Sequence, residues 1–407
     1  MCENQLLAEK DVMMQPPADN APNAAIVSHH MPIIGKVWLT TSHASTAAML
    51  KDNERFSMRG AKSGRIAGLQ WWMPRSLRLL AKNMLTSDDP DHRRLRQLVD
   101  QAFQRRAVLS MRSEVTQIAN RLLSEIEQGD SQSGDSFDVL ANYARRLPLE
   151  VIAELLGLPA HYRDSFRVHA ERLSGVTGLL DFLKMLLPLK RMVALLQQII
   201  DEYRSGDVQQ SGLISELLAL QTQNTGSADH QISDNELLAM VFLLLMAGHE
   251  TTTHAITTSI HALETHPVQK ALFLKADSPA LAVEELLRFN SPVQYSKPRH
   301  VRTGGDFFGV RIKQGDLIMA DLAQANRDPL VFEKPDELDL TRKPNPHLEF
   351  GTGVHFCLGF QLARLEIDVA LRALYGRFPN LKISCEPKWR TAFRWRALDE
   401  LKLETGL

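Results

Sequence analysis

The longest apolar stretch of the chain lies within residues 233–267 and predicts one long helix. Ser233 and Glu236 form a Ser-x-x-Glu capping box, which marks the N-terminus of a helix. No proline follows until Pro267, so at about 1.5 Å per residue the helix can extend for roughly 50 Å. Nearly every position of 237–246 is apolar, which indicates that other elements surround the helix. We therefore expect it to cross the domain through the core.

Other periodic segments predict further helices. Apolar positions recur at helical spacing from residue 360, and Gly376 followed by Pro379 predicts the end of that helix. Residues 178–200 are rich in Leu, Met and Phe and are interrupted by Pro188, which predicts two amphipathic helices packed on a core.

Strand patterns are fewer and shorter. Residues 37–39 predict a strand that leads through a turn into a helix, and 308–316 predict a hairpin. Residues 390–403 predict a second hairpin with its tip at 391–395. The first 24 residues are polar, contain two adjacent prolines, and are expected to be disordered.

The loop at 350–359 contains three glycines, one histidine and one cysteine, and it directly precedes the helix predicted from residue 360. Gly351 and Gly353 permit positive φ and a close approach to a flat object, and Gly359 leaves room where the helix begins. Cys357 would lie at the helix N-terminus, where free N–H groups and the helix dipole favour a thiolate.

A thiolate at Cys357 could be a nucleophile, a zinc ligand or an iron ligand. Zinc requires three or four ligands, and the other two cysteines, Cys2 and Cys385, are remote in sequence. His355 is only two residues away, which is poor geometry for the base of a cysteine nucleophile. A thiolate axial to haem iron needs no second protein ligand. For an isolated cysteine, a buried structural role is the alternative.

The predicted long helix carries an unusual polar segment at 247–252, with the sequence Ala-Gly-His-Glu-Thr-Thr. A glutamate in a core helix is costly unless it has partners or a task. A zinc-protease helix needs two histidines on one face. His249 and His254 are five residues apart, which separates them by roughly 140° around the helix and excludes that interpretation.

Composition narrows the class of protein. The 407 residues are 44% hydrophobic and carry a formal charge of −1, so neither nucleic acid nor an anionic membrane is expected as the main partner. Three widely spaced cysteines fit a reducing cytoplasm better than a disulfide framework. No apolar run reaches about 18 residues, so no transmembrane anchor is expected, and residues 1–23 lack the features of a signal peptide.

Residues 350–359 resemble the haem-binding loop of the cytochrome P450 family, Phe-Gly-x-Gly-x-His/Arg-x-Cys-x-Gly, and match it at every fixed position. The resemblance covers roughly residues 35–403. It implies the cytochrome P450 fold, mainly α with a smaller β-rich region, as a single domain over 25–407. It also implies haem b as the cofactor and the soluble bacterial type of the family, located in the cytoplasm.

The resemblance assigns the haem contacts. Cys357 would be the axial ligand of the iron, and Phe350 would also contact the cofactor. His355 and Arg299 would bind haem propionates, as would His92 and Arg96. Arginine is well suited to carboxylates because it can form bidentate hydrogen bonds with them.

The residues before this last pair predict the start of a helix. Ser87 or Asp88 can cap it, and His92 and Arg96, four residues apart, then share one face. Without the resemblance, this would be an ordinary solvated basic face.

The segment at 247–252 resembles the family's oxygen-activation motif, Ala/Gly-Gly-x-Asp/Glu-Thr. In this interpretation Ala247 leaves space for dioxygen, Thr251 hydrogen-bonds to it, and Glu250 relays protons from solvent. An acid next to a hydroxyl suits a reaction that consumes protons.

Two further sets of residues follow from the resemblance. Glu285 and Arg288, in a helix predicted to start at Ser278-Pro279, would form a buried structural pair with Arg342 as a third member. The substrate pocket would be lined by Trp71, Trp72, Leu243, Val293, Gln294 and Phe393.

The implied activity is that of a haem-thiolate monooxygenase. It would insert one atom of O2 into a hydrophobic small molecule, by hydroxylation or epoxidation, with electrons from NAD(P)H through a separate ferredoxin or flavodoxin. A peroxide-using haem enzyme and a haem protein without turnover are alternatives, which the presence of Glu250 and Thr251 disfavours. A cysteine hydrolase based on Cys357 and His355, or a purely structural protein, is a further alternative.

Overall fold

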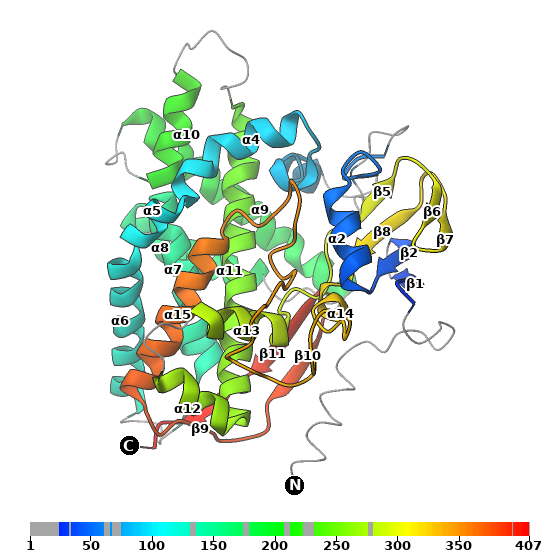
Figure 1. The fold of residues 1–407 in the computed structure, drawn as a ribbon. Helices are drawn as coiled ribbons and strands as arrows, with labels where there is room; N and C mark the ends of the chain where they lie inside the picture. Colours follow the sequence, from blue (N-terminus) through cyan, green and yellow to red (C-terminus); the bar gives the residue numbers. More distant parts are fainter. Residues whose placement is uncertain are drawn as a thin grey trace.

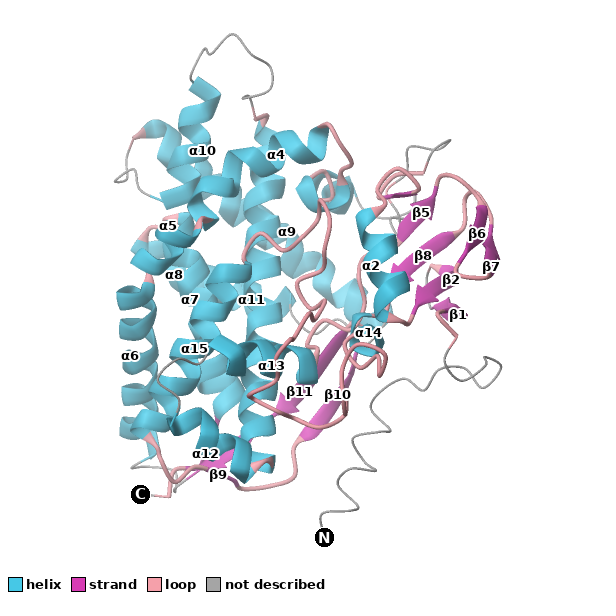
Figure 2. Cartoon of the chain, viewed as in Figure 1, coloured by secondary structure: helices cyan, strands magenta, loops and turns pink. Residues whose placement is uncertain are grey.

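Helices make up most of the molecule, and the strands gather mainly on one side (Figures 1 and 2). The prediction of a mainly α fold with a smaller β-rich region is therefore confirmed. The computed structural model describes residues 24–31, 34–60, 66, 75–130, 136–173, 179–206, 212–222, 232–275, 280–392 and 394–406.

Runs of consecutive helices are separated by groups of short strands. The α-helices are α2 (His43–Lys51), α3 (Arg75–Leu80), α4 (Asp91–Asp100), α5 (Arg105–Ser110), α6 (Arg112–Asp130), α7 (Arg146–Leu156), α8 (Ala160–Leu173), α9 (Leu179–Ser205), α10 (Gly212–Thr222), α11 (Asp234–Thr265), α12 (Pro267–Lys275), α13 (Ala280–Asn290), α14 (Leu322–Ala325) and α15 (Phe360–Arg377). The strands are β1 (Ile26–Met31), β2 (Gly35–Thr40), β3 (Phe56–Ser57), β4 (Ser136–Asp138), β5 (Arg299–Val301), β6 (Gly305–Phe307), β7 (Val310–Ile312), β8 (Leu317–Ala320), β9 (Lys382–Ile383), β10 (Lys388–Ala392), β11 (Trp395–Glu400) and β12 (Lys402–Glu404).

Helix α11 is the predicted long helix, and it runs through the middle of the helical part (Figure 1). The capping box forms as predicted, because the Ser233 side chain accepts from the Glu236 N–H while the Glu236 carboxylate accepts from the Ser233 N–H. Neighbours α7, α13 and α15 pack against α11. Its buried apolar side chains belong to the largest hydrophobic core of the protein.

Two predictions are based on the positions of glycine and proline: the end of the helix near Gly376, and a break of the helical segment at Pro188. Helix α15 ends at Arg377, one residue beyond Gly376, as predicted. The prediction of two helices over 178–200 is wrong, because α9 continues through Pro188 as a single helix of 27 residues. Leu189 and Met192 are fully buried directly after the proline, and their packing holds the two halves in line.

A five-stranded sheet, in the order β1-β2-β8-β5-β3, forms the β-rich region. Its neighbours are antiparallel except for β2 and β8, which are parallel. Phe56, Ile318 and Leu322 form part of a second, smaller core beneath it. The predicted hairpins are both present, as β6–β7 with Phe308-Gly309 at its turn, and as β10–β11.

Some predictions fall outside the described residues. These are the disorder of residues 1–24, apart from residue 24 itself, and the helix start at Ser278-Pro279. Within the residues that are described, no helix is both long and apolar enough to cross a membrane.

Candidate active site

A cavity of about 310 Å³ lies between α11 and the loop at 350–359. Residues of α4 and of the extended segment 292–299 complete its walls. The Cys357 side chain and the polar segment of α11, which are more than a hundred residues apart in sequence, therefore line the same space.

Two glycines give the 350–359 loop its shape. Gly351 and Gly353 have φ angles of 68° and 79°, which favour glycine. A Cβ on Gly353 would also lie 2.6 Å from the Leu50 carbonyl oxygen, so α2 packs directly against the loop. Gly359 has a φ of −84°, which any residue can adopt, and a Cβ there would make only ordinary contact with Phe103. The Cys357 N–H donates to the Phe350 carbonyl at 2.9 Å and closes the loop.

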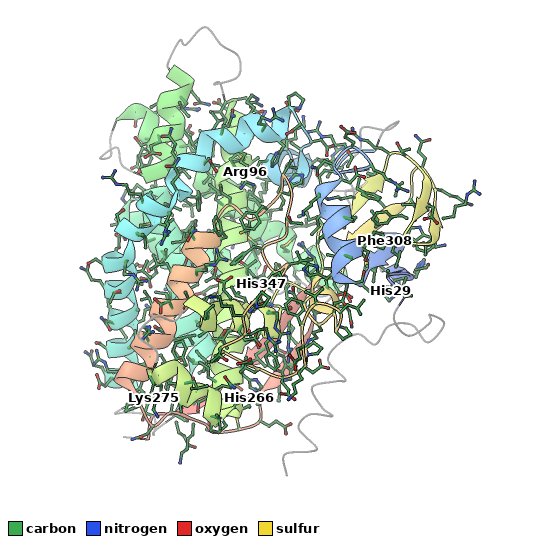
Figure 3. All side chains as sticks on the ribbon, viewed as in Figure 1. His29, Arg96, His266, Lys275, Phe308 and His347 are labelled. Carbon is green, nitrogen blue, oxygen red and sulfur yellow. The ribbon has the colours of Figure 1, made fainter. Side chains whose placement is uncertain are left out.

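Helix α4 holds this loop from the side through Arg96, which Figure 3 labels. The Nη1 of Arg96 donates to the carbonyl oxygens of Val354 at 3.1 Å and Phe356 at 2.7 Å. One turn earlier, the ring of His92 meets the ring of His355 edge to face, with centroids 4.4 Å apart. The four-residue spacing thus brings both α4 side chains to the cysteine loop, and both line the cavity.

The predicted cap of this helix is wrong. Helix α4 begins after Pro90, and neither Ser87 nor Asp88 caps it with a side chain. The Asp88 carboxylate instead accepts from the backbone N–H groups of Met58 at 2.9 Å and Arg59 at 3.2 Å. These long-range partners replace the local N–H groups that a cap would have used.

Arg299 lies on the cavity wall with its side chain buried. Its Nη1 donates to the Leu50 carbonyl at 3.2 Å and to Oδ1 of Asn53 at 3.1 Å. Burial lowers the pKa of Arg299 to about 10, although nearby carboxylates oppose this effect. Burial, together with the charge of Arg299, lowers the pKa of His355 to about 3. His355 is therefore neutral, and the positive charge of Arg299 would stabilise an anion beside these two side chains.

The structure reverses the prediction that the helix N-terminus makes Cys357 a thiolate. Burial raises the pKa of its thiol to about 11, although the Gly359 N–H and the charges of Arg96 and Arg364 act in the opposite direction. Desolvation therefore outweighs the helix terminus. A thiolate here needs a bound metal, which deprotonates a coordinating thiol.

The donor set of the cavity fits haem. One thiol, Cys357, lies among cationic and imidazole side chains that suit the two propionates, and most other lining residues are apolar. No group of three or more His, Cys, Asp or Glu residues able to hold a bare metal ion occurs in the described part of the chain. A metal bound by Cys357 must therefore bring its other ligands with it, as iron does in a porphyrin.

The segment that resembles the oxygen-activation motif reaches the cavity only in part. Ala247, Gly248, Thr251 and Thr252 line it, and the Thr251 hydroxyl donates to the Ala247 carbonyl at 2.7 Å. Glu250 is buried behind this wall and does not line the cavity. Its Oε1 lies 3.9 Å from Nε2 of His254.

The residues predicted for the substrate pocket divide into three groups. Leu243 and Val293 line the cavity. Gln294 does not, although residues on both sides of it do, and its N–H donates to the Arg394 carbonyl at 3.0 Å. Trp71, Trp72 and Phe393 lie outside the described residues.

Glu285 and Arg288 are fully buried and joined by two hydrogen bonds of 2.8 Å. The Nε of Arg342 donates to both oxygens of Glu285, at 3.1 and 3.0 Å. Arg288 also donates to backbone carbonyls of the segment between α14 and the cysteine loop. The three side chains therefore join α13 to that segment.

Four acidic or basic residues on the cavity wall were not predicted. Lys297, Glu349 and Arg394 line it, as does Glu366 of α15, whose Oε2 is enclosed without a hydrogen-bond partner among the described residues. Lys297 could have been found, since it lies only two residues before Arg299 in the same segment. Glu366 likewise lies seven residues beyond Gly359 on one face of α15.

These features fit a haem site in which one cysteine, Cys357, faces a helix that carries a hydroxyl side chain, Thr251, across the cavity. Comparison with known proteins gives the family. The model of the family "Cytochrome P450" matches residues 186–273 and 280–389. A "Cytochrome P450" of Bacillus subtilis is 36% identical over 385 residues, which cover 91% of this chain and 88% of the relative.

Two further relatives agree. The 6-deoxyerythronolide B hydroxylase of Saccharopolyspora erythraea is 35% identical over 89% of each chain. A myxobacterial cytochrome P450 solved in complex with myristic acid has a TM-score of 0.83 and 31% identity, over 94% of this chain and 93% of that one. The chain belongs to the cytochrome P450 family and is a haem-dependent monooxygenase of the bacterial type.

If Arg299 binds a propionate, replacing it by Leu is expected to weaken haem retention about tenfold, because a charge-assisted hydrogen bond to that carboxylate would be lost. The rate of haem transfer to apomyoglobin measures the effect. The control is Arg311→Leu, on the exposed part of β7 and away from the cavity. Equal transfer rates for the two variants would contradict a role of Arg299 in holding a propionate.

Proposed function

We propose that this chain binds haem b through Cys357 and inserts one oxygen atom from O2 into a hydrophobic small molecule. Electrons would come from NAD(P)H through a ferredoxin or flavodoxin. The observation that carries the proposal is that the Cys357 side chain and the Thr251 hydroxyl line one apolar cavity. This shared lining supports the proposal, in which Cys357 would bind the cofactor and the Thr251 hydroxyl would serve oxygen.

The propionates would be held by His92, Arg96, Arg299 and His355. The contacts of α4 and α2 with the 350–359 loop support this role, since they fix these side chains on the cavity wall. Cys357 is the only described cysteine that lines the cavity. Once it binds iron, no thiol remains there for covalent attachment, and this supports haem b.

The bound haem supplies the centre at which dioxygen is activated. Thr251 provides a proton-bearing hydroxyl beside it. This hydroxyl now donates to the Ala247 carbonyl, and its oxygen keeps lone pairs that can accept a hydrogen bond. Glu250, one residue earlier and buried behind the cavity wall, would pass protons toward the hydroxyl. The apolar walls exclude bulk water from the reaction.

A hydrophobic substrate is supported by the lining of the cavity and by the relatives. Leu243, Leu244, Val293 and Ile152 all contribute apolar surface. Relatives are named for hydroxylation of vitamin D(3) and of 6-deoxyerythronolide B, and another is solved with myristic acid. The molecules in these names differ from one another, but each is a largely apolar organic compound.

Thr251→Ala tests the proposed role of the hydroxyl. The variant is expected to bind haem normally but to form about tenfold less product per NAD(P)H consumed, with the missing reducing equivalents recovered as hydrogen peroxide. Product, NAD(P)H and peroxide are measured together in the presence of a ferredoxin or flavodoxin and its reductase.

The matched control is Thr258→Ala. Thr258 lies on the same helix and donates to the His254 carbonyl at 2.7 Å, but it is buried away from the cavity. Undiminished product per NAD(P)H in the Thr251 variant would contradict the proposal. Turnover of the wild type by peroxide alone, at the rate reached with reductase, would favour the peroxide-using alternative.

A further inference from the structure

Lys297 and Arg394 line the cavity but have no part in the site described above. Neither side chain forms a hydrogen bond or ion pair with another described residue, and Nε of Arg394 is fully enclosed. The guanidinium of Arg394 packs over the ring of Trp395, 5.2 Å from its centroid. Both residues are half-buried, and cations partly removed from water without an anionic partner are costly, so their presence in an apolar cavity requires a reason.

Backbone contacts hold the two cations on one wall. The Gln294 N–H donates to the Arg394 carbonyl at 3.0 Å, and the Arg396 N–H donates to the Pro292 carbonyl at 3.1 Å. Val293 also pairs with Trp395 across this contact. The segment before β5 and the turn between β10 and β11 are therefore fixed against each other.

The surrounding charges do not offset the burial of this pair. Burial and the charge of Arg394 lower the pKa of Lys297 to about 7. Burial also lowers the pKa of Arg394, while the charge of the Glu250 carboxylate acts in the opposite direction. Each cation thus makes the other more costly, and a bound anion would relieve both.

Haem propionates are the rival anion, because Lys297 lies only two residues before Arg299. Hydrogen bonds separate the two positions. The Arg299 guanidinium donates to the Leu50 carbonyl and to Asn53, beside the 350–359 loop. The segment that carries Lys297 is instead held against Arg394 by the Gln294 N–H.

We propose that Lys297 and Arg394 bind the carboxylate of a hydrophobic substrate, whose apolar body occupies the rest of the cavity. The planar guanidinium can donate two parallel hydrogen bonds to one carboxylate, and the lysine ammonium can donate another. A few convergent polar groups in an apolar cavity are the usual means of orienting a ligand. This inference rests on the proposed function and narrows its substrate class to hydrophobic carboxylic acids.

The test compares saturated fatty acids, from octanoate to hexadecanoate, with their methyl esters. Each is titrated into the haem-loaded full-length protein, and binding is followed by the change of iron spin state in the visible spectrum. At least one acid is expected to bind about tenfold or more tightly than its ester. Lys297→Met and Arg394→Met should each lose roughly tenfold in affinity for that acid and little for the ester.

Lys313→Met, on the exposed side of the β-rich region, is the control and should keep the preference for the acid. The inference is overturned if no acid binds more tightly than its ester, or if both Met variants keep the preference. It is also overturned if Lys297→Met loses haem while the preference persists, since Lys297 would then serve a propionate.

Failure of this inference is distinguishable from failure of the proposed function. A protein that oxidises neutral apolar compounds with NAD(P)H, yet shows no preference for acids, contradicts only the carboxylate site. A haem-loaded protein that oxidises neither acids nor esters contradicts the proposed function itself.

Discussion

Cys357→Ser is expected to abolish the red-shifted Soret band of the ferrous carbon monoxide complex and to reduce monooxygenation to background. Cys357 is the one described cysteine on the cavity wall, and no set of three metal-binding side chains is present in the described part of the chain to replace it. A serine hydroxyl is a poor ligand because it stays protonated, whereas a coordinating thiol loses its proton to the metal. Absorbance of the reduced, carbon monoxide-treated protein measures the loss.

Cys385→Ser is the matched control, because Cys385 is an exposed free cysteine far along the chain from the cavity loop. It should leave the spectrum and the activity unchanged. If the Cys357 variant kept the red-shifted band, the iron ligand would have to be a different residue. Haem content is measured in both variants, so that loss of the cofactor is separated from loss of the thiolate.

Local sequence patterns correctly predicted those features that depend only on residues close together in the chain. The capping box at Ser233 predicts the start of α11 to the residue, since both of its hydrogen bonds lie within one turn. Gly351 and Gly353 have the positive φ angles that the glycine pattern indicated. The four-residue spacing of His92 and Arg96 places both on one face of α4. In each case the relevant partner lies within a few residues.

Features that depend on distant packing could not be predicted in this way. The pKa of Cys357 is set by burial, which comes from elements far from its helix. Asp88 binds N–H groups of Met58 and Arg59 instead of capping α4. Arg394 and Lys297 share one cavity wall because the backbone at Arg394 and Arg396 binds that at Gln294 and Pro292. Sequence spacing holds no information on such contacts.

Gln294 is not part of the cavity wall, although the resemblance indicated a pocket position. Residues on both sides of it, from Pro292 to Lys297, do line the cavity, so no two-residue period distinguishes it from them. The Gln294 N–H donates to the Arg394 carbonyl, and its own carbonyl accepts from the Leu322 N–H. Its placement therefore depends on contacts with segments that are distant in sequence, which a local pattern does not indicate.

Glu285→Gln is expected to destabilise the protein by about 3–5 kcal/mol, the largest effect on stability predicted for a single site. The substitution keeps the size of the side chain but leaves the guanidinium groups of Arg288 and Arg342 without their counter-charge. The side chains of Glu285 and Arg288 are 0% exposed and that of Arg342 is 9% exposed, so water cannot replace the lost charge. Against a total stability of roughly 5–15 kcal/mol, such a loss removes a large share.

The control is Glu337→Gln. Glu337 pairs with Lys334 at the same three-residue spacing, at 3.3 Å, but these side chains are 65% and 66% exposed. Its loss should cost less than about 1 kcal/mol, because water screens and solvates exposed charges. Urea titration followed by the Soret band and by circular dichroism measures both variants. Equal midpoints would show that the Glu285 network adds no more than a surface pair, whereas a much lower midpoint for the Glu285 variant would establish that burial makes this pair indispensable to the segment leading to Cys357.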